Sequence, residues 1–232
     1  MMEGPQRKSV RCPALSPVHS CHPTEIAMKG SDMGTTFRSP EHMASFTDVD
    51  ERWGPLAKLS GHWEGDQGRD FSYSYSEKSD TENLYREEVT FDPFGPVDNG
   101  SQQLFGVDYR MKAWRLGQEE PFHMEVGYWL FEPSTGVIHR CFMVPRSTTI
   151  VAEGTTTAES TTFHLTAEQG SLTNGILSNS YLQKGAAAGV SYALDVDLAD
   201  GRFRYKEDLV MRMASHDGAE MHHTDENVLN RA

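Results

Sequence analysis

Short runs that alternate between hydrophobic and polar residues dominate the chain from Leu56 onward. The run Phe71–Ser76, "FSYSYS", alternates strictly, as expected for a strand with one buried face. Two β-rich runs flank a "PSTG" turn at Pro133–Gly136, and two more flank Asp200-Gly201. Pairs of strands joined by short glycine-containing turns are typical of β-hairpins. The pattern therefore predicts an antiparallel sheet.

Helical periodicity is weak in this part of the chain. The segment Asp50–Gly61, "DERWGPLAKLSG", is the best candidate for a short helix, whereas Asn179–Gly189 contains too many glycines for more than a turn or two. About ten short strands without long helices favour a sandwich or a barrel. Because regular hairpin turns pair each strand with its neighbour in sequence, we expect a single antiparallel up-and-down β-barrel of about ten strands. The short helix would act as a lid or lie at the opening of the barrel.

Residues 1 to about 50 differ from the rest of the chain. They are rich in Pro, Ser, His and Met and show no sustained hydrophobic period. Such a segment does not bury enough apolar surface to offset the entropy lost on ordering. We therefore divide the chain into a disordered N-terminal tail over residues 1–50 and one β-barrel domain over residues 51–232.

Composition narrows the range of partners. The formal net charge of −13 argues against nucleic acids and anionic membranes, since both attract clustered Lys and Arg. The three cysteines, Cys12, Cys21 and Cys141, do not indicate a disulfide framework. The chain lacks an uninterrupted apolar run of ~18 residues and a signal-peptide core. We therefore expect a cytoplasmic protein that binds neither nucleic acid nor membrane. The composition does not determine its oligomeric state, and a homodimer is one option.

Four segments carry motifs that occur in order along the chain. They are "GHWEGDQG" (Gly61–Gly68), "YREEVTFDPFG" (Tyr85–Gly95), "PFHMEVGYW" (Pro121–Trp129) and "VMRMASHDGAEMHH" (Val210–His223). Together they resemble the nitrobindin family of haem-binding β-barrels, which is related in shape to the fatty-acid-binding proteins and lipocalins. The first motif occurs widely in such barrels, where its tryptophan, here Trp63, plugs the closed end. The last motif is the most specific.

Two neighbouring histidines, His222 and His223, end the fourth motif. Neighbouring side chains of a strand point to opposite faces, so one imidazole faces the interior, and alternation alone does not choose between them. Nitrobindins carry an Arg-Met pair and, ten residues after the Met, the histidine that ligates haem iron. Met213 of Arg212-Met213 stands at that spacing before His223. The resemblance therefore implies that His223 is the axial ligand of a ferric haem b, with the sixth position open.

The resemblance assigns further residues to the cavity wall. Met213 would pack against the macrocycle. His123 would line the haem cavity, although a hydrogen-bonded core histidine is an equally good interpretation of this residue. Arg146 and Thr148, in "RSTTIV", would contact the cavity or a haem propionate. Glu125, by contrast, is expected to be part of a charge pattern on the solvent side.

Two functions follow from this sequence. The resemblance implies a ferric-haem protein that binds or transforms nitric oxide or peroxynitrite, with isomerisation of peroxynitrite to nitrate as its reaction. The alternative is a non-redox carrier of an apolar small molecule, a lipid or a tetrapyrrole, because a barrel of this size holds one small ligand. In both cases the partner is a small molecule.

Overall fold

The computed structural model describes residues 49–232, so nearly all of the predicted N-terminal tail lies outside the described residues. The strands are β1 (Gly61–Ser74), β2 (Ser79–Asp98), β3 (Gln103–Arg115), β4 (His123–Glu132), β5 (Val137–Val144), β6 (Thr148–Thr155), β7 (Thr162–Gln169), β8 (Gly175–Leu177), β9 (Ala187–Asp197), β10 (Phe203–Met213) and β11 (Glu220–Arg231). The short helical segments are η1 (Glu51–Lys58), η2 (Leu182–Ala186), η3 (Ala199–Gly201) and η4 (Ala214–His216). Within these described residues, no helix is long and apolar enough to cross a bilayer.

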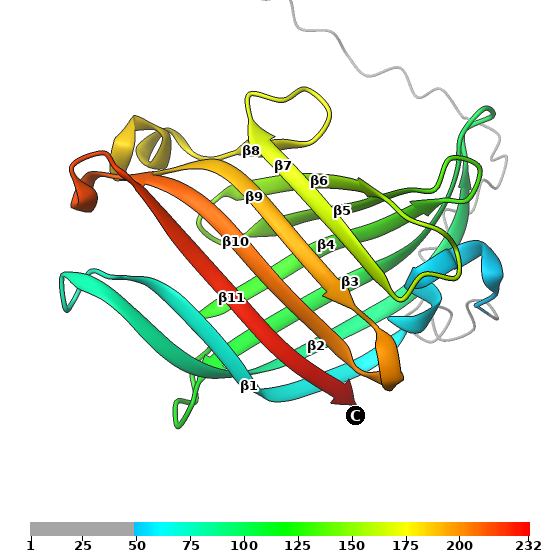
Figure 1. Ribbon diagram of the computed structural model, residues 1–232, viewed down its shortest axis with the longest axis horizontal. Helices are drawn as coiled ribbons and strands as arrows, with labels where there is room; N and C mark the ends of the chain where they lie inside the picture. Colours follow the sequence, from blue (N-terminus) through cyan, green and yellow to red (C-terminus); the bar gives the residue numbers. More distant parts are fainter. Residues whose placement is uncertain (1–48) are drawn as a thin grey trace, which may run out of the picture. The chain divides into compact units, whose positions relative to one another are not determined.

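The strands close into one barrel (Figure 1), in the order β1-β11-β10-β9-β7-β8-β6-β5-β4-β3-β2. The predicted all-β barrel is confirmed, and most strands that are adjacent in sequence pair in the sheet, although β9 pairs with β7 rather than with β8. Two details of the prediction were wrong. The barrel has eleven strands, and β8 pairs with β7 in parallel rather than antiparallel fashion. A strand as short as Gly175–Leu177 shows too little alternation to be found from hydrophobic periodicity.

The two predicted hairpin turns are present. Gly136, at φ 73°, closes the turn between β4 and β5. Asp200 and Gly201, at φ 58° and 67°, close the turn between β9 and β10. Glycine adopts such left-handed conformations without steric cost, and aspartate tolerates them better than most residues.

One end of the barrel is closed by η1 and by two indole rings. Trp53, Leu56 and Trp63 are almost fully buried there. The Nε1 atom of Trp63 donates a hydrogen bond to the carbonyl oxygen of Leu59 at 2.6 Å, and that of Trp53 donates to Gly106 at 3.1 Å. In Figure 1, η1 lies at the end of the barrel opposite the β1–β2 and β10–β11 turns. The short helix is therefore a plug of the closed end and not a lid over the opening.

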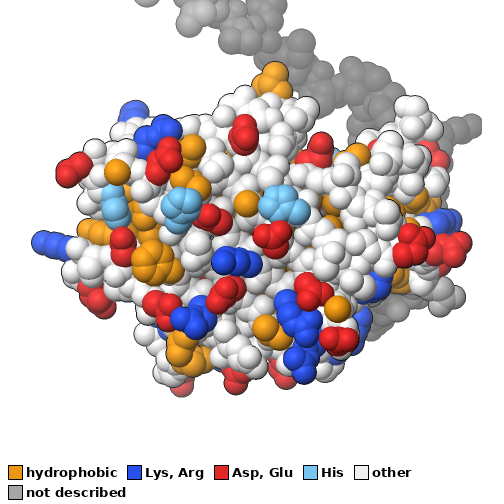
Figure 2. Space-filling model, viewed as in Figure 1, with side chains coloured by type: hydrophobic (Ala, Val, Ile, Leu, Met, Phe, Trp, Pro, Cys, Tyr) orange, Lys and Arg blue, Asp and Glu red, His pale blue; other side chains and the backbone are white. Residues whose placement is uncertain are grey.

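The outside of the barrel is polar where it is formed by β9, β10 and β11. Figure 2 shows acidic and basic side chains interspersed on this face, with smaller apolar areas between them. Alternate residues of each strand point inward, and near η1 these residues form a continuous aromatic and aliphatic core. Toward the other end, polar groups and a cavity replace the apolar core.

Candidate ligand-binding cavity

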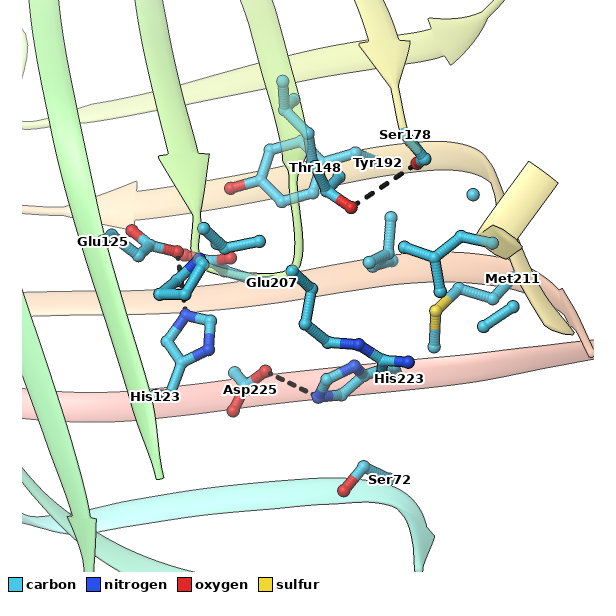
Figure 3. A pocket seen from close by; sticks show the side chains of 18 of the residues that line it. Ser72, His123, Glu125, Thr148, Ser178, Tyr192, Glu207, Met211, His223 and Asp225 are labelled. Atoms are coloured by element: carbon cyan, nitrogen blue, oxygen red, sulfur yellow. Dashed lines mark hydrogen bonds and ion pairs between the residues drawn. The ribbon is translucent and has the colours of Figure 1, made fainter. Parts of the chain in front are cut away.

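A cavity of about 420 Å³ opens at the end of the barrel away from η1. Its apolar walls come from β5, β6, β8, β10 and η2. They include Phe142, Val144, Ile150, Ile176, Leu182, Leu209 and Met211. Part of the wall is shown in Figure 3. A largely apolar cavity of this size with a few polar groups is typical of small-molecule sites.

The structure brings all the residues that the sequence nominated to the wall of this one cavity. His123 begins β4, Arg146 lies in the turn between β5 and β6, and Thr148 begins β6. Met213 ends β10, and His223 lies near the start of β11. The barrel closes these distant segments around the same opening. The contacts of each residue with a ligand remain a prediction.

The register of β11 separates the two neighbouring histidines. His223 pairs with Leu209 of β10 and faces the cavity, with 29% of its side chain exposed. His222 faces outward, is 62% exposed, and its Nδ1 lies 2.8 Å from a carboxylate oxygen of Asp208. The inward imidazole is therefore the one that the spacing from Met213 indicated.

Two carboxylates hold the ring of His223. Its Nε2 atom lies 2.9 Å from Oδ1 of Asp70 and 3.2 Å from Oδ2 of Asp225. In Figure 3, His223 and Asp225 point toward each other along β11. Burial by itself would lower the pKa of His223, but the hydrogen bonds to Asp225 and Asp70 outweigh it and raise the pKa to about 10. The imidazole is thus held as a cation.

The sequence patterns did not indicate Asp70 as a site residue. Its side chain is the least exposed polar one of the site, at 1%. Its Oδ2 accepts hydrogen bonds from Ser72 Oγ at 2.9 Å and from Asn83 Nδ2 at 3.1 Å. Burial opposes ionisation, but the bonds from His223 and these two donors keep the pKa of Asp70 below its ordinary value. Asp70 and Ser72 share a face in the alternating segment "RDFSYS", but polar residues in such a pattern usually indicate the solvent face.

A buried ionic network forms the floor of the cavity, and it corrects the expectation for Glu125. This residue is 4% exposed and faces inward, because residues two apart in a strand share a face and His123 already points to the cavity. Its Oε1 lies 3.2 Å from Nε2 of His123. Its Oε2 lies 2.5 Å from Arg140 Nη2 and accepts a hydrogen bond from Tyr109 at 2.8 Å.

Arg140 connects this carboxylate to a second one. Its Nη1 forms an ion pair with Glu207, which also lines the cavity, and donates to Tyr192 at 2.5 Å. Burial raises the pKa of Glu125, but the guanidinium of Arg140 and the bond to His123 prevail and lower it to about 2. A buried charge with its partners in place is tolerated, whereas a buried charge that loses its partner is costly. The network therefore gives the cavity a fixed polar floor opposite its opening.

The only described residues close enough together to form a three-ligand metal site are Asp70, His223 and Asp225, whose ligand atoms lie within 4.8 Å of one another. Both carboxylates are engaged by the same ring nitrogen. The arrangement presents one imidazole with carboxylate partners on an otherwise apolar wall. Such a site can supply a single nitrogen ligand to a flat apolar molecule once the ring releases Nε2 from these carboxylates.

Comparison with known proteins identifies the family and the fold of this barrel. A family model described as THAP4-like, heme-binding beta-barrel domain matches residues 52–231. Among solved structures, the crystal structure of Rv2717c from M. tuberculosis matches with a TM-score of 0.56 and 19% sequence identity, covering 80% of this chain and 99% of that chain. At this identity the likeness concerns the fold alone. A search of curated proteins returned no match.

Proposed function

Because the chain belongs to the THAP4-like, heme-binding beta-barrel domain family, we propose that its cavity binds haem b in the ferric state, with His223 as the protein ligand of the iron. The observation that carries this proposal is the inward imidazole of His223 on the cavity wall, ten residues after Met213, which is the spacing found in nitrobindins. A neutral imidazole is a common axial ligand of haem iron.

The residues around the cavity fit this group. Leu209 pairs with His223 across the sheet, and Met211 and Met213 continue the cavity wall along β10. Methionines adapt readily to the shape of a ligand. Arg146 is an exposed cation on the wall, suited to a propionate, and Thr148 lies two residues further along the chain. The cavity is open to solvent at one end, which allows the propionates of a bound haem to remain hydrated.

The proposed activity is the isomerisation of peroxynitrite to nitrate, with nitric oxide as a further ligand. Haem bound in the cavity would supply a ferric iron that coordinates these molecules. The chain would supply the axial nitrogen of His223, apolar walls that exclude water, and limited access. His123 adds a second imidazole to the same cavity. Burial opposes its ionisation, but Glu125 raises the pKa of His123, so this ring is suited to hydrogen-bond an anion.

A second candidate function is the carriage of an apolar small molecule without redox chemistry. One observation favours it. The Nε2 atom of His223 is already engaged by Asp70 and Asp225, and a cavity with apolar walls binds a lipid or a tetrapyrrole without a metal bond.

Titration with hemin tests the proposal against this alternative. We expect the full chain to bind one equivalent with a sharp Soret band, His223→Ala to lose the band, and His222→Ala to keep it, because His222 lies outside the barrel. Loss of the band in His222→Ala alone would show that the wrong histidine has been assigned. A Soret band that persists in both variants would show that His223 is not the iron ligand. Only broad, nonspecific absorption by the unmodified chain would favour the apolar carrier.

Stopped-flow spectroscopy then tests the reaction. With hemin bound, the chain should accelerate the decay of peroxynitrite and raise the yield of nitrate relative to nitrite. The haem-loaded His222→Ala variant should behave in the same way. A decay rate equal to that of free hemin would leave haem binding intact and remove the proposed activity.

A further inference from the structure

We propose that Asp70 is a positioning residue that holds the imidazole of His223 against the barrel wall, and so weakens the affinity of the cavity for haem. The inference rests on the proposed role of His223. It concerns the carboxylate on the neighbouring strand, which no motif of the sequence indicated.

The contact joins two adjacent strands. Asp70 lies on β1 and pairs in register with Asp225 of β11, two residues from His223. The buried Oδ1 of Asp70 lies 2.9 Å from Nε2 of His223, closer than the 3.2 Å of Asp225. Both carboxylates therefore approach the same ring nitrogen, and the N–H there points along the wall to β1.

Asp70 is anchored independently of His223. Ser72 and Asn83 both donate to Oδ2 of Asp70, which leaves Oδ1 for the imidazole. Arg115 in turn donates to the side-chain oxygen of Asn83. If His223 turned away, the carboxylate would keep two donors. Release of the ring thus costs Asp70 one charge-assisted hydrogen bond, in addition to the contact of the ring with Asp225, and does not leave the buried carboxylate of Asp70 without partners.

Iron and Asp70 compete for this imidazole. A ligand nitrogen must offer a lone pair, whereas Nε2 in this structure serves a carboxylate as a hydrogen-bond donor. Replacing Asp70 by Asn keeps the size of the side chain and leaves a neutral acceptor, which binds an imidazole N–H less strongly. We expect Asp70→Asn to lower the dissociation constant of hemin by roughly fivefold to tenfold.

The chain contains a matched control on the opposite face. His222 and Asp208 form the same kind of pair, at 2.8 Å, but outside the barrel. Asp208→Asn makes the same chemical change beside His222, the neighbour of His223 in sequence, without touching the cavity wall. Its dissociation constant for hemin should equal that of the unmodified chain.

The test compares hemin titrations of the unmodified chain, Asp70→Asn, Asp208→Asn and His223→Ala, together with the nitrogen NMR signals of His223 in the haem-free proteins. We expect tighter binding and shifted ring signals in Asp70→Asn alone. Equal or weaker binding in a folded Asp70→Asn protein overturns the inference, because Asp70 would then support ligation or have no part in it. If His223→Ala binds hemin as tightly as the unmodified chain, the proposed haem ligand itself is wrong.

A second variant should change the affinity for hemin in the opposite direction through the same contact. Asn83→Ala removes one donor from Asp70, so the carboxylate should hold His223 more firmly and hemin should bind more weakly. This result would support the inference even if Asp70→Asn did not fold. Unchanged or tighter binding in Asn83→Ala would count against it.

Discussion

Tyr205 donates a hydrogen bond of 2.5 Å to Oε2 of Glu87, with both side chains buried inside the barrel. Asn227 donates to the same oxygen at 3.0 Å. Burial nevertheless outweighs these bonds and raises the pKa of Glu87 to about 7. The folded protein therefore favours the protonated form of Glu87 at neutral pH and below. Its contribution to stability is fully present below the ordinary pKa of Glu and is lost as the pH rises through about 7.

Glu87→Gln should remove this pH dependence, because an amide stays neutral. Between pH 5 and pH 8 the unmodified chain should lose roughly 3 kcal/mol more of its free energy of unfolding than the variant does. Urea titrations of both proteins at the two pH values measure the difference. Equal losses in the two proteins would mean that Glu87 does not titrate in this range.

Arg140→Met should be strongly destabilising at neutral pH, by about 3 to 5 kcal/mol, because it leaves the buried carboxylates of Glu125 and Glu207 without their cation. The loss should shrink toward pH 4, where these carboxylates can be protonated. In the unmodified chain the pKa of Glu125 is lowered to about 2, so its contribution is present above the ordinary pKa of Glu and is lost as the pH falls toward 2.

The control for this experiment is Arg212→Met. Arg212 pairs with Glu220 at 3.4 Å on the surface, and an exposed pair of this kind contributes about 0 to 1 kcal/mol. Chemical denaturation of both variants at pH 4 and pH 7 provides the comparison. Similar losses for the two arginines, or a loss in Arg140→Met that does not depend on pH, would contradict the role given to the buried network.

Trp63→Ala should cost roughly 3 to 5 kcal/mol in the free energy of unfolding, since it empties the closed end of the barrel. The indole packs edge-on against Phe203 at a centroid distance of 6.2 Å, and the guanidinium of Arg231 lies 4.5 Å from its centre. Tyr75→Ala, at an exposed aromatic on the rim, should be nearly neutral. Denaturant titration measures both, and a loss below about 1 kcal/mol for Trp63→Ala would be too small for a buried indole.

Alternation predicted the barrel, and the resemblance to nitrobindins predicted the inward position of His223, but neither indicated what holds that ring. In "RDFSYS" the aromatic residues would be expected to face inward. Instead, Phe71 is 40% exposed and Asp70 is buried. Three donors on other residues stabilise the carboxylate inside, and two of them come from distant parts of the chain. A pattern along one strand contains no information about such partners.

The ionic floor of the cavity could not be predicted from the sequence for the same reason. Glu125, Arg140 and Glu207 lie on β4, β5 and β10, so no strand contains two members of the network. A charged residue in an amphipathic strand normally indicates the solvent face. The barrel makes burial favourable by bringing the opposite charges together, which is a property of the closed sheet and not of any one segment.

The closed end of the barrel also determines how the protein can be attached to a surface. Lys58, the last residue of η1, accepts a hydrogen bond from Arg231 at 2.8 Å, and the amide of Ala232 donates to the carbonyl oxygen of His62 at 3.1 Å. The C-terminus thus leaves at the plugged end (Figure 1), and the cavity opens at the other. A linker joined after Ala232 would orient an immobilised layer with every cavity facing the solution, which is the arrangement that a ligand sensor requires.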